Sequence, residues 1–264
     1  MSDPISPSAA PGAEAIPDIL TLERAALTAT PAPRVGWDGG FVVRCFRGGT
    51  GRANAASCLD PTPDAALPAR IERIEADFRR HGLRPRFRST PLDPPGLETA
   101  LRARGYREAD GACILLGSLA ALAVAAAPLG ERLERPSEDW IAVQATAEHQ
   151  TPARRAEKLE AATLLARPGC WLLHRVEGQP AAAAHAVADD ALCGFFDVAT
   201  TPAHRRKGLS QGVLAAAAAW GLEQGARHAW LQVSPGNAPA LALYAGLGLR
   251  EVYRYRYFTH RKDG

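Results

Sequence analysis

The chain has 264 residues, which is enough for two domains of ordinary size with buried cores. Its 47% hydrophobic and 22% charged residues are typical of a soluble globular protein. The net charge of only +3 argues against a nucleic-acid-binding face and against a polybasic membrane patch. The five cysteines are scattered and form no CxxC pair, so we expect no disulfide framework, no metal site and a reducing, cytoplasmic location.

Two stretches are interpreted as neither targeting signal nor membrane span. Residues 1–17 are rich in Ala, Pro and Ser and lack a basic start and an apolar block, so we predict a disordered lead-in. The uncharged stretch Gly111–Gly130 is dominated by alanine and interrupted by Gly117 and Pro128. We interpret it as a strand that ends near Leu116 and an Ala-rich linker.

The first half of the chain alternates strand and helix patterns. Its glycine-rich loop Arg47–Gly51 is interpreted as a hairpin turn and not as a phosphate cradle, because no helix follows and no Lys-Ser/Thr pair closes it. We predict a helix at Leu20–Ala29, strands at Trp37–Phe46 and Arg52–Cys58, an amphipathic helix at Pro68–His81, a strand at Arg86–Ser89, a helix at Leu97–Arg104 and a strand at Tyr106–Leu116.

The second half shows the same order of elements after a linker at Ala120–Arg135. An antiparallel meander leads into a buried central strand, and the tail alternates Tyr and Arg as a half-exposed strand does. We predict helices that begin near Ser137 and span Thr151–Ala166, strands at Cys170–Arg175, Pro180–Val187 and Leu192–Ala199, a helix from Gly208 to Gly225, a strand at His228–Val233, a helix at Ala238–Leu247 and a strand at Glu251–Phe258.

The closing units of the two halves also match in detail. Leu97–Tyr106 can be aligned with Ala240–Leu249, and in that register Leu101 takes the place of Tyr244. We interpret the halves as a divergent internal repeat whose first copy lacks the chemistry of the second.

The turn after the central strand is suited to an anion. Arg205-Arg206-Lys207-Gly208-Leu209-Ser210 leads into a helix, where several main-chain N–H groups point outward and the helix dipole favours negative charge. Gly208 lets a phosphate approach the backbone closely. Basic helix starts are also common on solvated surfaces, so this turn alone does not decide between the two interpretations.

A downstream helix supplies the second signal. Asn237 lies where this helix begins, and Tyr244 lies two turns further on. An N-cap and a core tyrosine would explain each residue separately, but not why the pair follows one strand after a phosphate-type turn.

These features together resemble the acetyl-CoA-binding region of the GCN5-related N-acetyltransferase (GNAT) family. Ser210 and Leu249 replace the usual Gly/Ala and Phe, which are mild departures. The whole chain resembles tandem members of the family, in which a degenerate N-terminal copy precedes the working one. The matching segments are Val198-Ala199-Thr200-Thr201-Pro202, Arg205-x-x-Gly208-x-Ser210 and Asn237-x-x-Ala240-x-x-x-Tyr244-x-x-x-Gly248-Leu249.

The resemblance implies an α/β (α+β) fold with two GNAT-like domains, each a mixed, mostly antiparallel twisted sheet flanked by helices. We place the degenerate domain at 18–117, the linker at 118–136 and the catalytic domain at 137–264.

The resemblance also implies acetyl-CoA as the cofactor and assigns residues to it. The backbone at Val198–Thr200 would pair with the pantetheine arm, a strand N–H near Val198 or Thr200 would act as oxyanion donor, and Asn237 would anchor the cofactor. Tyr244 would stand by the sulfur as general acid. The expected cofactor-binding residues are Val198, Ala199, Thr200, Arg205, Arg206, Lys207, Gly208, Leu209, Ser210, Gln211, Asn237 and Tyr244.

The residue that accepts the proton of the acceptor amine is less defined. Asp197 on the central strand is the first candidate base, directly or through water, although it is one residue out of phase with the carboxylates of some relatives. The alternatives are Glu148, His149 and His185.

The predicted function is transfer of an acetyl group from acetyl-CoA to a primary amine of a small metabolite or a protein, in a monomer or homodimer without a nucleic-acid or membrane partner. The alternative is a non-catalytic acyl-CoA-binding or sensing module. Tyr244 favours the enzyme, because a binding module needs no hydroxyl beside the sulfur.

Overall fold

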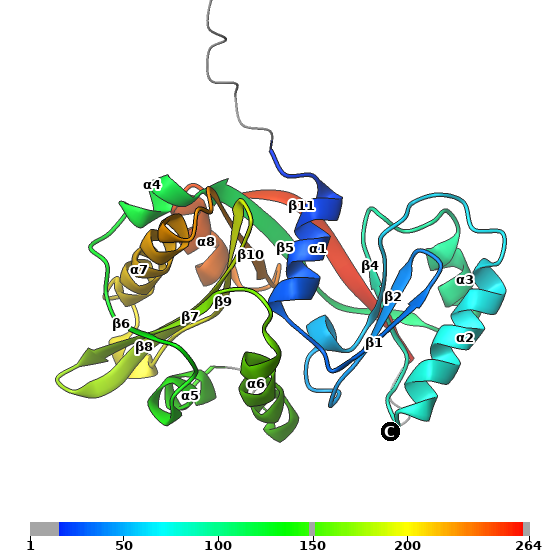
Figure 1. Cartoon of the computed structure of the whole chain (residues 1–264), viewed down its shortest axis with the longest axis horizontal. Helices are drawn as coiled ribbons and strands as arrows, with labels where there is room; N and C mark the ends of the chain where they lie inside the picture. The colour runs from blue at the N-terminus through cyan, green and yellow to red at the C-terminus, as the bar shows by residue number, and fades with distance from the viewer. Residues whose placement is uncertain (1–15, 148–150, 261–264) are drawn as a thin grey trace, which may run out of the picture.

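A computed structural model describes residues 16–147 and 151–260, and the strands of this part form one continuous twisted sheet (Figure 1). Most of the predicted lead-in, and the candidates Glu148 and His149, lie outside the described residues. Across the sheet the order is β1 (Arg34–Asp38), β2 (Phe41–Cys45), β3 (Ala56–Cys58), β4 (Arg86–Ser89), β11 (Arg250–Thr259), β5 (Arg107–Ser118), β10 (His228–Val233), β9 (Leu192–Thr200), β8 (Gln179–Asp189), β7 (Gly169–Val176) and β6 (Glu131–Leu133).

The two halves of the chain exchange their last strands at the centre of this sheet. Strand β5 lies between β10 and β11, and β11 lies between β4 and β5. Each half also contributes one parallel pair, β3 with β4 and β9 with β10, among otherwise antiparallel neighbours. The mixed, mostly antiparallel α/β fold is therefore confirmed. Two separate domain sheets are not, because the sheet continues across the boundary expected near residue 117.

Helices cover both faces of the second half of the sheet. On one face, α4 (Leu119–Ala123), α7 (Leu209–Glu223) and α8 (Ala238–Gly246) pack on a core that includes Phe195. On the other, α1 (Ile19–Ala29), α5 (Glu138–Ala145) and α6 (Pro152–Leu164) pack on cores to which Phe196 and Ala199 belong (Figure 1). Successive residues of a strand point to opposite faces, so β9 separates the two sides.

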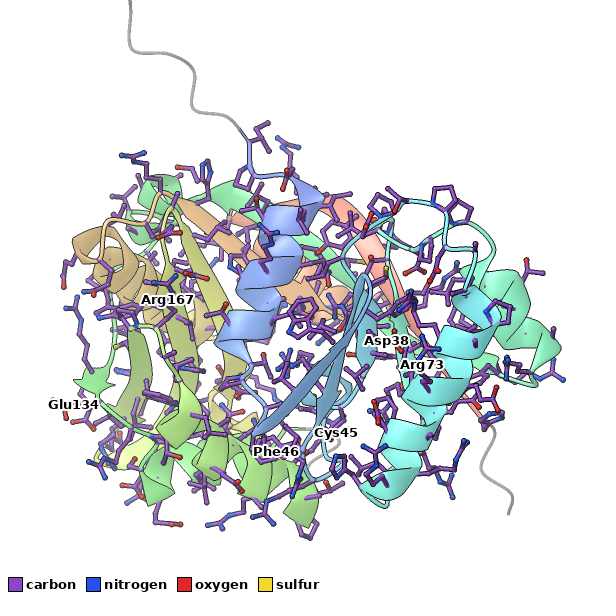
Figure 2. All side chains as sticks on the ribbon, turned by 45° about the vertical axis from the view of Figure 1, so that its right-hand side comes forward. Asp38, Cys45, Phe46, Arg73, Glu134 and Arg167 are labelled. Atoms are coloured by element: carbon purple, nitrogen blue, oxygen red, sulfur yellow. The ribbon has the colours of Figure 1, made fainter. Side chains whose placement is uncertain are left out.

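The first half has its own helical layer. Helices α2 (Leu67–Arg80) and α3 (Leu97–Ala103) bury Ile71, Ile74 and Leu101 against β2–β4 and β11. Figure 2 shows Arg73 of α2 and Asp38 of β1 turned toward each other, and their Nε and Oδ2 atoms are 2.7 Å apart. The aligned residues Leu101 and Tyr244 are both buried on short helices that precede a central strand.

Most predicted helices and strands are confirmed with ends within about two residues. Three segments differ. The strand predicted at Trp37–Phe46 is the β1–β2 hairpin, which turns at Gly39, where φ is +58°. The strand predicted at Arg52–Cys58 begins as the 3-10 turn η1 (Gly51–Ala53). The predicted linker contributes α4 and the edge strand β6.

The remaining sequence expectations concern cysteines and membrane spans. Each of the five cysteines is buried with a free thiol. Among the helices of the described residues, none is both long and apolar enough to span a bilayer.

Candidate active site

Strands β9 and β10 separate part-way along their length. They pair in parallel from Leu192 and His228 to Phe195 and Leu231, and no pairing continues beyond that point in the described structure. The last residues of β9 therefore pair with β8 alone. Their second edge is open, and an open strand edge offers main-chain N–H and C=O groups to an extended ligand.

The turn that follows β9 exposes a row of main-chain donors. Arg206 and Gly208 both have positive φ angles, +64° and +77°, and α7 begins directly after Gly208. The N–H groups of residues 206–211 form no hydrogen bond within the described part of the chain. A side chain built on Gly208 would meet no atom nearer than Gln211 Oε1 at 3.8 Å, so space for a phosphate lies above this turn. These observations fit the pyrophosphate of coenzyme A.

Ser210 connects the open strand to the donor row. Its hydroxyl lies 2.8 Å from the Thr200 hydroxyl, at hydrogen-bonding distance. Arg205 Nε also donates to the main-chain oxygen of Thr200. The serine that departs from the family pattern thus holds the end of β9 against the start of α7.

Asn237 and Tyr244 lie where an N-cap and a core tyrosine would lie, and each also keeps a hydrogen-bonding group available to a ligand. Asn237 Oδ1 caps the helix by accepting from the N–H of Ala240 at 3.2 Å. Tyr244 is buried on the α7 side of the sheet, where burial raises the pKa of its hydroxyl to about 12. That hydroxyl makes no hydrogen bond to the described residues and is protonated at neutral pH.

A β-bulge places Asp197 on the opposite side of the sheet from Tyr244. Ala183 pairs with Ala199 and His185 with Phe196, which leaves Asp197 and Val198 opposite one residue of β8. Asp197 has a φ of +53°. The extra residue shifts the alternation, so that Asp197 shares a face with Phe196, and both line the same cavity. The bulge therefore determines which face of the sheet Asp197 lies on.

This cavity lies between the two halves of the chain and has a volume of about 110 Å³. Helix α6 and strands β8 and β9 form one side, and the segment from Phe46 to Ala53 forms the other; Figure 2 shows Phe46 at the end of β2. Its aromatic walls are Trp140, Trp171, His185 and Phe196, and its charged side chains are Arg52, Arg154, Glu157, Lys158 and Asp197.

Asp197 is held by a cation and an amide. Lys158 Nζ donates to Asp197 Oδ1 at 2.7 Å and to Gln144 Oε1 at 3.3 Å, and Gln144 Nε2 donates to the main-chain oxygen of Asp197. Burial acts to raise the pKa of Asp197, but Lys158 and Arg52 outweigh it and hold that pKa below its usual value. The carboxylate is therefore ionised near neutral pH.

His185 lies beside Asp197 in a drier environment. Its ring stacks on Trp171 with centroids 4.3 Å apart, and its Nε2 atom is buried without a hydrogen-bond partner in the described residues. Burial lowers the pKa of His185 to about 4, and Lys158 and Arg52 add to this effect while Asp197 opposes it. The imidazole is neutral at pH 7.

The structure thus gathers the predicted site in two groups. Val198–Thr200 lie on the open stretch of β9, residues 205–211 follow it, and α8 packs on the same face of the sheet as α7, whereas Asp197 and His185 line the cavity on the other face. Sequence reasoning missed Lys158 and Arg52. Lys158 offered one signal, since it is one of only three lysines in a chain with 31 basic residues.

Comparisons with known proteins show which family the chain belongs to. A family model described as "Probable histone acetyltransferase Rv0428c C-terminal" matches residues 16–258. The uncharacterized N-acetyltransferase YobR of Bacillus subtilis is 24% identical over 251 residues, covering 92% of this chain and 99% of that protein. Streptothricin acetyltransferase of Streptomyces lavendulae is 40% identical over 52 residues, which are 20% of this chain and 28% of that protein.

Solved structures share the fold. A GCN5-related N-acetyltransferase from Kribbella flavida has a TM-score of 0.64 at 22% identity, covering 92% of this chain and 96% of its own. A tandem GNAT protein from the clavulanic acid biosynthesis pathway has a TM-score of 0.59 at 15% identity, covering 96% and 89%. With the family match over nearly the whole chain, the protein belongs to the family described as probable histone acetyltransferase Rv0428c C-terminal, and it is an acetyltransferase of the GNAT family.

Proposed function

We propose that this acetyltransferase transfers the acetyl group of acetyl-CoA to a primary amine by direct attack of the amine on the thioester. One observation carries the proposal: the open edge of β9 leads into the unpaired N–H groups of residues 206–211. An extended arm that ends in a pyrophosphate matches this combination of strand edge and anion site.

Binding would use the main chain more than side chains. The edge at Val198–Thr200 pairs with the pantetheine arm, and the N–H groups of residues 206–211 hold the pyrophosphate. Arg205, Arg206 and Lys207 are exposed beside them and add positive charge. Asn237 fixes the start of α8 through its cap and keeps its amide nitrogen available as a donor.

Tyr244 suits proton donation at the sulfur. Acetyl-CoA, when bound, supplies the activated thioester. Because burial raises the pKa of Tyr244 to about 12, its hydroxyl carries a proton at neutral pH and donates a hydrogen bond to the departing thiolate. An N–H of β9 next to the bulge, near Val198 or Thr200, stabilises negative charge on the carbonyl oxygen.

Asp197 faces the acceptor. Its lowered pKa favours orienting the amine and passing the proton to water over storing the proton itself. His185, the alternative candidate, offers an unpaired Nε2 atom, but burial lowers its pKa to about 4, so it too is suited to passing the proton to water and not to storing it. The family is described as a probable histone acetyltransferase, and the relative that matches over 52 residues is a streptothricin acetyltransferase. The proposed acceptors therefore include both proteins and small molecules.

The test combines binding with turnover. We expect the purified chain to bind acetyl-CoA in calorimetry and to release free thiol when a panel of amines is added. Tight binding without thiol release from any amine would identify a binding or sensing module. Absence of acetyl-CoA binding would contradict the site itself.

A further inference from the structure

The cavity beside Asp197 contains an arginine from the other half of the chain. Arg52 belongs to η1, and its side chain is half-buried. Its guanidinium lies over the Phe196 ring, 5.9 Å from the centroid, and forms no hydrogen bond or ion pair with the described residues. A guanidinium that is partly removed from water without an anionic partner is suited to binding one from a ligand.

The other charged side chains of the cavity are already engaged. Glu157 accepts hydrogen bonds from the loop before η1, Arg154 Nε donates to the main-chain oxygen of Gly49, and Lys158 is paired with Asp197 Oδ1. Asp197 Oδ2 accepts no hydrogen bond within the described residues. Among the described residues that line it, the cavity therefore presents one available cation, Arg52, and one available carboxylate oxygen, from Asp197.

These two groups lie near each other. The charge of Arg52 is among the influences that lower the pKa values of both Asp197 and His185, which places the guanidinium within electrostatic reach of both side chains. Asp197 itself follows the last residue of β9 that pairs with β10, beside the open edge proposed for the thioester.

We propose that the acceptor is a small amino-acid-like amine that also carries a carboxylate, which Arg52 binds while Asp197 Oδ2 orients the amine. The inference rests on the proposed function, because it assumes that the amine reacts at the open edge of β9. Arginine binds carboxylates through two parallel N–H donors, and the aromatic walls formed by Trp140, Trp171 and Phe196 contact the apolar part of such a molecule.

The charge of the cavity opposes simple amines. Three cations and two carboxylates line it, so an ammonium ion without its own anion meets a net positive surrounding. A zwitterion satisfies both available groups. In the reaction the acceptor ammonium first gives one proton to water, and the free amine nitrogen then bonds to the acetyl carbon. The carbon–sulfur bond breaks, the nitrogen loses its second proton as the thiolate takes one up, and the carboxylate is unchanged.

The test compares matched acceptors. Each of a series of L-amino acids is assayed beside its amide and its decarboxylated amine, with acetyl-CoA, by thiol release and by calorimetric binding to the CoA-loaded protein. We expect kcat/KM for the preferred amino acid to exceed that of its amide by about 10- to 100-fold, the size expected for hydrogen bonds to a charged group.

Two variants connect this preference to Arg52. Arg52→Gln is expected to remove the difference between acid and amide mainly through KM, and Arg52→Lys to restore part of it. Arg47→Gln is the matched control, because Arg47 precedes the same loop but is exposed and pairs with Glu160 outside the cavity. Acetyl-CoA affinity and thermal unfolding should be unchanged in Arg52→Gln.

Three outcomes would each overturn the inference. The natural chain could use amides and acids equally, Arg52→Gln could retain the preference for acids, or the protein could acetylate protein lysines while no amino acid is bound or acetylated. Loss of acetyl-CoA binding would instead contradict the proposed function, so the two failures are distinguishable.

Discussion

The carboxylate of Glu157 on α6 accepts a hydrogen bond from the main-chain N–H of Gly49 at 2.7 Å, so the second half of the chain is fastened to the glycine-rich loop of the first. Glu157 is buried, and all of its donors are neutral groups. The other donors are the N–H groups of Arg47 and Thr50 and the Asn54 amide. The sequence predicted that the loop Arg47–Gly51 does not bind a phosphate. Its main-chain N–H groups instead bind a carboxylate of the same chain, that of Glu157.

We expect Glu157→Ala to lower the free energy of unfolding by about 2–4 kcal/mol, because it leaves several buried donors without an acceptor. Glu160→Ala is the matched control on the same helix. Its exposed pair with Arg47 should contribute less than about 1 kcal/mol. Urea unfolding of both variants measures the difference. Equal stability losses would contradict a special role for the Glu157 contacts.

Gly208→Glu should abolish acetyl-CoA binding in calorimetry, because the new carboxylate occupies the space above the N–H groups of residues 206–211 and repels a pyrophosphate. Gly225→Glu serves as the control. It imposes a similar backbone strain, since φ is +87° there, at the exposed far end of the same helix. Normal binding by Gly208→Glu would remove this turn from the site.

Tyr244→Phe should lower kcat by about 10- to 1000-fold, the range of general acid catalysis, with little change in acetyl-CoA affinity. The side chain stays in its core position, so only the hydroxyl is lost. Tyr106→Phe, which removes a hydroxyl bonded to Glu75 in the first half, is the control and should leave kcat unchanged. An unaltered rate in Tyr244→Phe would exclude the tyrosine from the chemistry.

The local elements, and the helix starts on which the proposed cofactor site rests, were predictable because their signals are local. Gly208, Asn237 and Tyr244 act through helix starts and spacing, which periodicity and capping rules describe. Their places in the structure agree with those rules: Gly208 precedes α7 and Asn237 caps α8.

On the proposed acceptor side, Asp197 and His185 were named from the sequence, but the contacts around them were not predictable because they join segments far apart in sequence. The pairs Glu157–Gly49 and Lys158–Asp197 join segments separated by 108 and 39 residues. The exchange of β5 and β11 was also not predictable, because nothing in the sequence of either strand specifies which strand it pairs with. The face on which Asp197 lies could not be read from a period-two pattern, because a β-bulge shifts the alternation between Phe196 and Ala199.

Lys158→Met should shift the acidic limb of the pH profile of kcat/KM upward. Burial acts to raise the pKa of Asp197 and Lys158 is the strongest influence that lowers it, so removing the lysine raises that pKa. If Asp197 must be ionised to orient the amine, activity then falls at a higher pH. The control is Arg155→Gln. Arg155 lies on α6 like Lys158 but forms an exposed ion pair with Glu138 of α5, so this variant should leave the pH profile unchanged. An unshifted limb in Lys158→Met would separate Asp197 from the acceptor.

His185 should make the fold sensitive to mild acid. Its pKa is about 4 in the folded protein and 6.5 in the unfolded chain, so the unfolded state binds the extra proton between these values. The stability that depends on neutral His185 is present above pH 6.5 and is lost as the pH falls toward 4. At pH 5 the expected loss is about 2 kcal/mol. Urea unfolding at pH 7.5 and pH 5 measures it.

The variant His185→Phe isolates this contribution, because other titrating groups affect both proteins alike. We expect its stability to fall less than that of the natural chain between pH 7.5 and pH 5, by about 2 kcal/mol. The stack on Trp171 is available to either ring. His81→Phe, at an exposed position after α2, should behave like the natural chain. If the pH dependence of His185→Phe equals that of the natural chain, the pKa of His185 is not lowered by burial, and the neutral imidazole is not a requirement of the fold.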